Sequence, residues 1–262
     1  MVSLSYLQDQ VLPTAEQLPC SDETPVDNQL QNDIPNLLLS LLATIWAERG
    51  DWYFGVDMAV YYNPDEDAIV PDGFLSIGVQ RDSGTRGRLS YVIWAEKVTP
   101  ILALEVISER YNSEYEDKLA DYQSLGILYY AIYNPFSGRR GRYKHRQKLE
   151  IYKLVKGKYK LINGDGNWTW LPEIGLGLGC ENGEHIGWER EWLYWYDSDG
   201  VRYATDAEMA VQERQEKLAE CQEKLAERQE KLAERQEKLA ERQQRKKLEA
   251  YLRSLGIDPD LI

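Results

Sequence analysis

A strict seven-residue repeat occupies the last quarter of the chain and fixes the type of one element. From Asp206 the composition changes sharply, and the motif Gln-Glu-Lys-Leu-Ala-Glu recurs every seven residues from Gln215 to Glu241. Glutamates precede lysines by four residues along this stretch, an order that supports a helix. The repeat therefore predicts a long helix over residues 206–247, followed by a tail over residues 248–262. It aligns one apolar column: Val211, Leu218, Leu225, Leu232 and Leu239.

The partnership of this helix is open. If the leucines occupy the d positions of a heptad, the a positions carry glutamines, which suit a buried seam poorly: Gln215, Gln222, Gln229 and Gln236. A period of seven rather than 3.6 favours a coiled coil, and hence a homodimer or higher homo-oligomer. The alternatives are a single solvated helix, or a helix folded back on the rest of the chain.

The remainder of the chain predicts one globular domain after a short leader. Residues 1–33 are acidic, contain three prolines and show little periodicity, so they predict a loosely structured lead-in. Helical spacing of apolar residues starts near Ile34, with Pro35 suited to a first helical turn. We expect residues 34–205 to form one domain of the α/β (α+β) class, with a mixed sheet flanked by helices.

Strands and a helix alternate within this region. The continuous apolar run at residues 101–107 predicts a strand covered on both faces. A capping-box pattern at residues 113–116 and a stop at Gly126 bracket a helix, so strand, helix and strand predict a right-handed parallel crossover. The glycine-rich segment 175–179 predicts a closing loop, with His185 in a glycine-rich loop after it. The other expected strands lie at residues 52–62, 70–77, 127–133, 149–155 and 159–162.

Charge and composition narrow the possible functions. The formal net charge of −13 disfavours non-specific coating of nucleic acid, because a globally acidic protein is repelled at long range. Residues 139–160 nevertheless hold ten basic residues and one acidic residue, Glu150. This strip predicts either a local nucleic-acid footprint or an exposed hairpin with a solvated basic edge.

Sparse cysteines and histidines exclude several kinds of site. The three cysteines lie far apart without metal-ligand spacing, which fits a reducing cytoplasm. No apolar run is long enough for a membrane span. With only His145 and His185 present, a three-histidine zinc site is excluded, and carboxylates and lysine are left to carry any chemistry.

Three residues form the candidate site. Glu105 interrupts the buried run, where a carboxylate needs a metal, a lysine or hydrogen bonds. Asp72 stands at the start of a predicted strand, and Lys118 lies on the helix that follows Glu105. Two carboxylates from neighbouring strands would suit Mg²⁺ or Mn²⁺, and a lysine could position the attacking hydroxide or neutralise developing charge. Taken singly, the three also suit a turn residue, a structural salt bridge and a solvated lysine.

The order of these motifs resembles one family. The segments Pro71-Asp72, Glu105-Val106-Ile107-Ser108 and Lys118-Leu119-Ala120-Asp121-Tyr122, followed by Gly126-Ile127-Leu128-Tyr129-Tyr130, resemble the Uma-two family of restriction-type endonucleases. The resemblance covers about residues 35–205. It implies a fold similar to the PD-(D/E)XK nuclease core, with Asp72 and Glu105 as metal ligands and catalytic residues.

The resemblance also implies a role for lysine and a substrate. Ile107 occupies the position of the (D/E)XK lysine, and Lys118 matches a lysine that the family places on the following helix. Glu48 is a further candidate acidic member. The implied function is Mg²⁺-dependent hydrolysis of DNA. If the C-terminal helix forms a dimer, its two sites would suit the two strands of a duplex. The alternative is a nuclease-like binding or assembly module without turnover.

Overall fold

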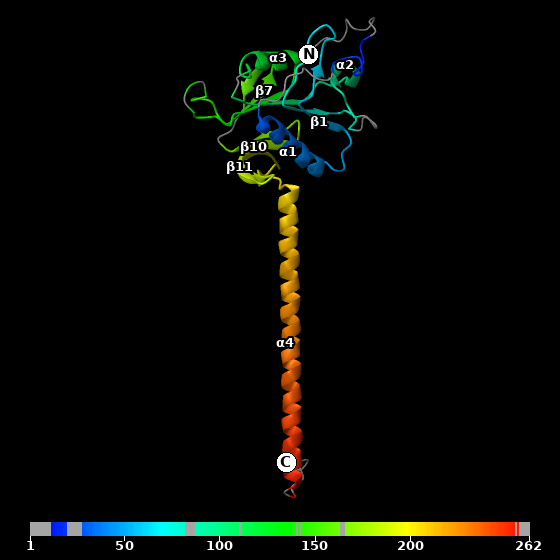
Figure 1. Cartoon of the computed structure of the whole chain (residues 1–262), viewed down its shortest axis with the longest axis vertical. Coiled ribbons are helices and arrows are strands. Elements are labelled where there is room, and N and C mark those ends of the chain that lie inside the picture. Colours follow the sequence, from blue (N-terminus) through cyan, green and yellow to red (C-terminus); the bar gives the residue numbers. More distant parts are fainter. Residues whose placement is uncertain are drawn as a thin grey trace. The chain divides into compact units, whose positions relative to one another are not determined.

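The chain consists of two compact units, Met1–Thr205 and Asp206–Ile262. A computed structural model describes residues 12–19, 28–81, 87–109, 112–139, 141, 143–162, 166–254 and 256 (Figure 1). Much of the predicted lead-in and residues 255 and 257–262 of the predicted tail, together with Cys20, lie outside these residues. In the described part of the chain, no helix combines the length and the apolar character that a membrane span requires.

The first unit is built on a six-stranded mixed sheet, in the order β1-β3-β5-β6-β7-β8. Strands β5 and β6 are parallel, and the other neighbouring pairs are antiparallel. A second sheet has the order β11-β10-β9, and a small one pairs β2 with β4. The elements are α1 (Gln29–Ile45), β1 (Trp52–Val56), β2 (Val60–Tyr61), β3 (Gly73–Ile77), β4 (Tyr91–Val92), α2 (Ile93–Glu96), β5 (Leu102–Val106), α3 (Asp117–Leu125), β6 (Tyr129–Tyr133), β7 (Leu149–Val155), β8 (Lys158–Leu161), β9 (Trp168–Leu171), β10 (Leu176–His185) and β11 (Trp188–Tyr196).

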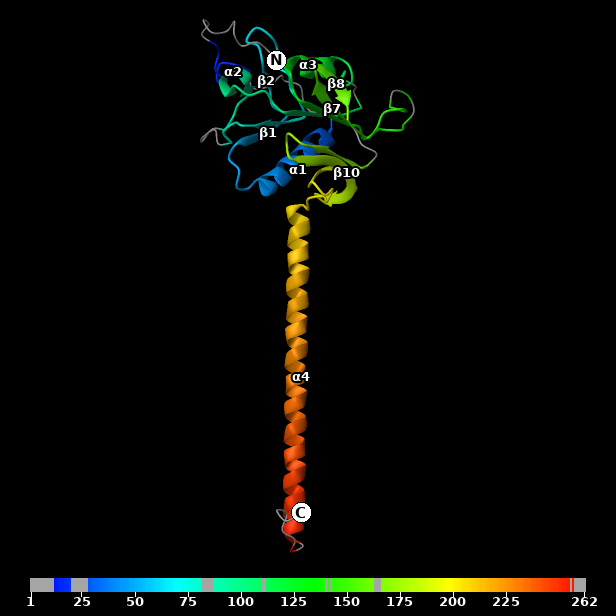
Figure 2. The same cartoon turned by 180° about the vertical axis from the view of Figure 1, so that it is seen from behind.

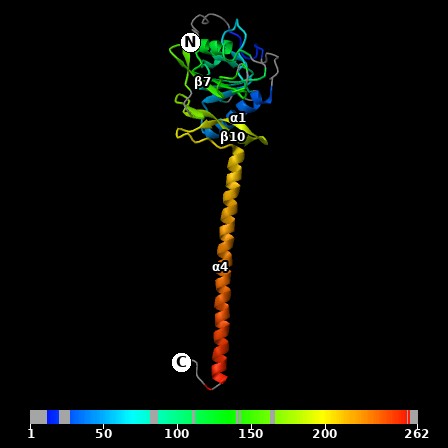
Figure 3. The ribbon, with the colours of Figure 1, turned by 90° about the vertical axis from the view of Figure 1, so that its left-hand side faces the viewer.

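The six-stranded sheet lies between two layers. Helix α3 covers one face, while α1 and the β9–β10–β11 sheet cover the other (Figures 1 and 3). Alternate residues of β5 serve the two faces: Leu104 packs in the core with α1, and Ala103 packs in the core with α3. The predicted mixed sheet flanked by helices is therefore confirmed, and β5 is buried on both faces as its apolar run predicted.

The parallel crossover and the hairpin are also confirmed. Helix α3 connects β5 to its parallel neighbour β6 and ends at Gly126, whose φ of 77° gives the left-handed C-cap. Strands β7 and β8 form an antiparallel hairpin. Lys156 and Gly157 both have positive φ in its turn, the backbone that a two-residue hairpin connection favours.

The predicted start of the first helix is wrong. Helix α1 begins at Gln29, because the Asn28 side chain accepts hydrogen bonds from the N–H groups of Leu30 and Gln31 and caps the helix there. Pro35 consequently lies inside the helix rather than in its first turn. Part of the expected loose leader also packs on the domain: the Trp94 indole N–H donates to the Pro13 carbonyl.

Two further boundaries need correction. The single strand predicted at residues 52–62 is two strands, because Asp57 adopts a positive φ of 47° and the chain turns out of the main sheet into the small one. The capping box at residues 113–116 does not cap the helix, which begins at Asp117. Instead the Ser113 carbonyl accepts the N–H of Lys118.

The glycine-rich segment is a strand rather than the predicted closing loop. Residues 175–179 lead into and form the first part of β10, and His185 ends that strand instead of lying in a loop. A side chain at Gly177 or Gly179 would collide with Trp168 on the neighbouring strand β9. The glycines therefore admit close packing of an aromatic ring rather than a turn.

The second unit contains one helix, α4 (Asp206–Ser254) (Figure 2). The helix prediction is confirmed, although α4 passes the expected end at residue 247 and takes in the start of the predicted tail. The column leucines are exposed, by 56–60% from Leu218 to Leu239. Four Lys side chains form ion pairs with the Glu four residues before them, as the repeat predicted.

Candidate active site

Asp72 directly precedes strand β3, and Glu105 lies on β5, the antiparallel neighbour of β3. Gly73 of β3 pairs with Leu104 of β5, so Asp72, the residue before β3, is opposite Glu105 one step beyond that pair. Side chains at opposite positions of an antiparallel pair point to the same face, with Cβ atoms about 5 Å apart. The local strand pairing thus brings together the two carboxylates that the sequence singled out.

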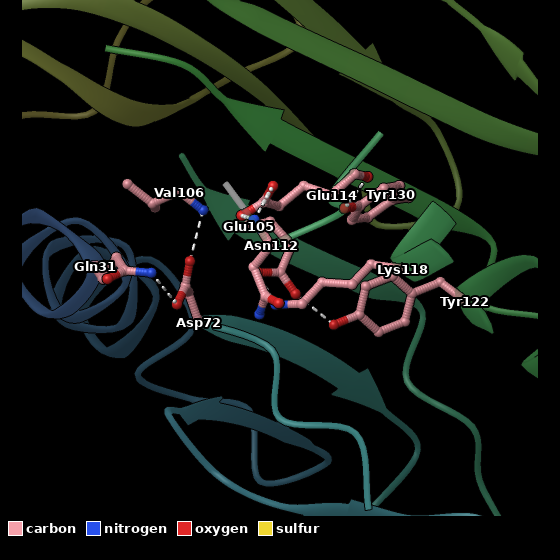
Figure 4. A network of polar contacts seen from close by, with 9 residues as sticks. All are labelled: Gln31, Asp72, Glu105, Val106, Asn112, Glu114, Lys118, Tyr122 and Tyr130. Atoms are coloured by element: carbon pink, nitrogen blue, oxygen red, sulfur yellow. Dashed lines mark hydrogen bonds and ion pairs between the residues drawn. The ribbon is translucent and has the colours of Figure 1, made fainter. Parts of the chain in front are cut away.

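Asp72 is held at the edge of the sheet by two hydrogen bonds (Figure 4). The Val106 N–H donates to Oδ2 at 2.6 Å, and the Gln31 side-chain amide of α1 donates to Oδ1 at 3.3 Å. Asp72 is buried, with only 8% of the residue exposed. Burial and the nearby charge of Glu105 raise the pKa of Asp72 well above the usual range of an aspartate.

Glu105 is almost completely buried and bonded at both oxygens. Its side chain is 1% exposed. Lys118 Nζ lies 2.8 Å from Oε2, and the Tyr122 hydroxyl donates to Oε1 at 2.5 Å. Both partners come from α3, four residues apart and hence on one face of the helix. Figure 4 shows the two side chains reaching from α3 toward Glu105.

Lys118 is the most exposed of the three, with 20% of its side chain open to solvent. Burial by itself would lower the pKa of Lys118. The ion pair with Glu105 and the negative charges of Asp72 and Glu114 outweigh that effect, so the pKa is raised. Lys118 is therefore an ammonium at neutral pH and cannot act there as a base.

The comparison with protein families matches this region. A family model named Uma2, with the description "Putative restriction endonuclease", matches residues 22–182, more than half of the chain. The chain belongs to the Uma2 family. Asp72, Glu105 and Lys118 all lie within the Uma2 match, whose description points to a nuclease-like function. No curated protein matches the chain.

The Uma2 region also brings in residues that sequence reasoning missed. Glu114, read from the sequence as part of a capping box, is 2% exposed and accepts the N–H of Asn112. Burial raises the pKa of Glu114, and the charge of Glu105 adds to this shift. Gln31 lay in the supposed leader, so nothing in the sequence connected it with Asp72. Tyr122 had a signal: its spacing of four from Lys118 places both on one helix face.

Two other positions in the Uma2 match are explained by the geometry. Ile107 is fully buried in the core beneath α3. Ile107 follows Glu105 by two residues, so both face the same side of the sheet, the side that α3 covers. Helix α3 provides Lys118 in place of the lysine that is missing at Ile107. Glu48 follows the C-terminal end of α1 and lines a surface pocket with Arg49 and Arg81. Because Gln31 reaches Asp72 from the other end of this 17-residue helix, about 25 Å away, Glu48 is not a member of the site.

The donor set of the site fits a hard divalent cation. Asp72 and Glu105 offer carboxylate oxygens, and each oxygen keeps a lone pair beyond the hydrogen bond that it accepts. No cluster of three or more Asp, Glu, His or Cys side chains in the described part of the chain is arranged to hold a metal. Mg²⁺ is commonly bound by one or two carboxylates together with waters and substrate phosphates, and this pair suits that mode.

Proposed function

We propose that the protein is a metal-dependent endonuclease that hydrolyses phosphodiester bonds of DNA with Mg²⁺ or Mn²⁺. One observation carries the proposal: a buried carboxylate just before β3 and a second on its neighbour β5 share their surroundings with a lysine ammonium. Membership of the Uma2 family supports a nuclease rather than another hydrolase. Asp72 and Glu105 are the proposed catalytic metal ligands, and Lys118 is the third catalytic residue.

The two carboxylates would act as anchors for the cation. Asp72 and Glu105 would hold a divalent ion, which would supply an activated water and polarise a phosphoryl oxygen. Asp72 must ionise to serve as a ligand, and its raised pKa makes the ionised form costly in the apo protein. A cation bound beside Asp72 would stabilise the ionised carboxylate and offset that cost.

Lys118 would stabilise charge rather than remove a proton. Its ammonium is held at a fixed point by Glu105 and is the part of the site most open to solvent. A scissile phosphate that approached from that side would meet a positive charge as negative charge developed on its oxygens. The raised pKa of Lys118 keeps this charge present across the neutral and mildly alkaline range.

Assembly and location form part of the same proposal. We infer that α4 pairs with a second copy of the chain through its leucine column, because a continuous exposed apolar stripe with a period of seven suits a coiled coil. Two sites in one dimer would address two strands. The catalytic domain would then run from α1 to residue 205. The sparse, widely spaced cysteines support a cytoplasmic location.

A binding or assembly module without turnover is the second candidate. Both oxygens of Glu105 already accept hydrogen bonds, and Lys118 is its ion-pair partner, so the site can also be viewed as a self-satisfied structural network. In that case added Mg²⁺ or Mn²⁺ would not raise thermal stability, because only a ligand of the native state stabilises it.

Cleavage of supercoiled plasmid tests the proposal directly. Purified protein is incubated with Mg²⁺, Mn²⁺ or EDTA beside Asp72→Ala, Glu105→Ala and Lys118→Ala. Metal-dependent nicking that all three substitutions abolish supports the nuclease and its site together. Nicking that survives the substitutions contradicts the site. No nicking in any metal by folded protein favours the binding module.

A further inference from the structure

The loop between β6 and β7, residues 134–148, holds six basic residues and no acidic one. In the sequence, this loop and the following β7–β8 hairpin share the basic strip at residues 139–160. In the fold, the loop and the hairpin turn lie at opposite ends of the strands. β6 ends at Tyr133, and the loop leaves the sheet there before β7 returns beside it. Figures 1 and 2 show the loop extending away from the sheet.

The loop leaves the sheet at the strand ends where the candidate site lies. Glu105 pairs with Ile132 of β6, so the loop begins two residues beyond the neighbour of a site carboxylate. Tyr133 pairs with Leu149, whereas Tyr129 pairs with Lys153, so β7 runs back toward the opposite edge. The β7–β8 hairpin turn therefore lies at the opposite ends of the strands, away from Glu105.

Tyr115 connects the loop to the site. The Asn134 side-chain amide donates to the Tyr115 hydroxyl at 3.1 Å, and the Arg146 guanidinium lies 3.8 Å from the centre of the Tyr115 ring. Tyr115 directly follows Glu114, whose charge contributes to the raised pKa of Lys118. Both ends of the loop are thus fixed against the turn that presents Lys118.

The loop has internal structure. The Ser137 hydroxyl donates to the Arg146 carbonyl at 2.7 Å, and the Gly138 N–H donates to the Tyr143 carbonyl at 3.1 Å. The rings of Phe136 and Tyr143 stack with their centres 5.9 Å apart. A pre-organised arm loses less conformational entropy when it binds a partner than an unstructured segment would.

Among the basic residues of the loop that the structure describes, the two at its base have carboxylate partners. Arg146 pairs with buried Glu150, and Lys148 pairs with Glu191. Farther out, Arg139 and Lys144 are exposed, and the described residues provide neither with a carboxylate partner. Arg140 and Arg142 belong to the same stretch of sequence but lie outside the described residues. Arg139 and Lys144 therefore present positive charge to solvent, despite the acidic net charge of the chain.

We propose that the β6–β7 loop is a backbone-binding arm that holds the phosphates of duplex DNA beside the Asp72–Glu105–Lys118 site. This inference rests on the proposed nuclease function. Clustered arginine and lysine without acidic neighbours fits a polyanion, and arginine in particular forms paired hydrogen bonds with phosphate. Phosphate contacts of this kind position the duplex without reading its sequence.

The test is binding of a fluorescent DNA duplex by the full-length protein in EDTA, followed by anisotropy over a range of salt concentrations. The variant is Arg139→Gln/Lys144→Gln. The control, Lys158→Gln/Lys160→Gln, removes the same charge from exposed positions of the β8 edge strand. Loss of two phosphate contacts should weaken binding roughly tenfold per contact at 0.1 M salt, and should reduce the slope of log K against log salt by about 1.8. The control should bind as the unaltered protein does.

The outcomes separate the arm from the nuclease. An unchanged affinity and slope in the loop variant, an equal loss in the control, or no duplex binding by the unaltered protein would overturn the arm. Plasmid nicking in Mg²⁺, measured on the same preparations, can succeed in each of those cases and would leave the nuclease standing. Duplex binding that depends on the loop, without nicking in any metal, would support the arm and refute the nuclease.

Discussion

Lys118 Nζ lies 2.8 Å from Oε2 of Glu105, which joins the start of helix α3 to the centre of the main sheet. Ile107 occupies the position of the (D/E)XK lysine and is buried in the core. Lys118 on helix α3 provides the lysine that contacts Glu105 instead. Because Glu105 is almost completely buried, each partner depends on the other for compensation of its charge.

Removal of the lysine should destabilise the domain. Lys118→Met keeps most of the apolar stem but leaves the Glu105 carboxylate uncompensated, and the free energy of unfolding should fall by about 3 kcal/mol. Urea unfolding measures the loss. Adding Glu105→Gln should restore much of it, because the stranded charge is then removed. If the double variant is no more stable than Lys118→Met, the ion pair does not account for the loss.

The Tyr122 hydroxyl should position Glu105 for metal binding. Tyr122→Phe keeps the ring and removes only the hydrogen bond to Oε1, a bond to a charged group worth about 1.5–3 kcal/mol. We expect weaker Mg²⁺ binding by calorimetry and, if the protein cleaves DNA, a lower kcat with little change in KM.

Tyr130→Phe provides the matched control for Tyr122→Phe. Tyr130 is equally buried, and its ring centre lies 4.9 Å from that of Tyr122, but its hydroxyl donates to the Glu114 backbone carbonyl. The Tyr130→Phe variant should lose stability, while its affinity for Mg²⁺ should stay the same as that of the unaltered protein. Equal losses of metal affinity in both variants would contradict a positioning role for Tyr122.

Neutralising Asp72 should stabilise the metal-free protein at neutral pH. The pKa of Asp72 is raised in the folded state, so the native protein binds more protons than the unfolded chain between the two pKa values. The contribution of this group to stability is then complete below the unfolded pKa of about 3.9 and is lost as pH rises through the folded pKa.

Asp72→Asn removes the loss of stability that accompanies ionisation of Asp72 in the folded protein. In EDTA its melting temperature should exceed that of the unaltered protein at pH 7 to 8, and the difference should shrink as the pH falls toward 4. Saturating Mg²⁺ should reverse the order, because at a hundredfold excess over Kd it stabilises only the unaltered protein, by about 2.7 kcal/mol. A melting temperature for Asp72→Asn below that of the unaltered protein throughout this pH range in EDTA would contradict the assigned direction.

The leucine column of α4 should control self-association. Leu225→Gln/Leu232→Gln removes two exposed leucines from the middle of the stripe. Light scattering should show a lower oligomeric state for this variant than for the full chain. Deletion of residues 206–262 should lower the oligomeric state as well. Glu223→Gln/Glu230→Gln introduces the same residue on an outward face of the same helix and should leave the mass unchanged. A monomeric full chain would refute the coiled coil.

The sequence by itself determined what depends on local pattern. The seven-residue period defined α4, the apolar run at residues 101–107 defined a strand buried on both faces, and the order strand, helix, strand defined the parallel crossover. These features follow from side-chain periodicity and turn chemistry, which act between residues close in the chain.

Element boundaries were less predictable where a single contact decides them. One side-chain cap moved the start of α1 to Gln29, and one positive φ at Asp57 divided a strand in two. The glycines near residue 177 signal a turn in the sequence, yet they accommodate a tryptophan from a neighbouring strand. That neighbour is known only once the sheet has formed.

Only the tertiary structure decided the surroundings of the candidate site. The sequence named Asp72, Glu105 and Lys118, but the register of β3 against β5 and the placement of α3 over the sheet bring their environments together. Gln31 and Glu114 join them from segments whose local patterns pointed elsewhere. Burial, hydrogen bonding and charge at a site depend on residues distant in the chain, and those long-range neighbours are fixed by packing rather than by local sequence.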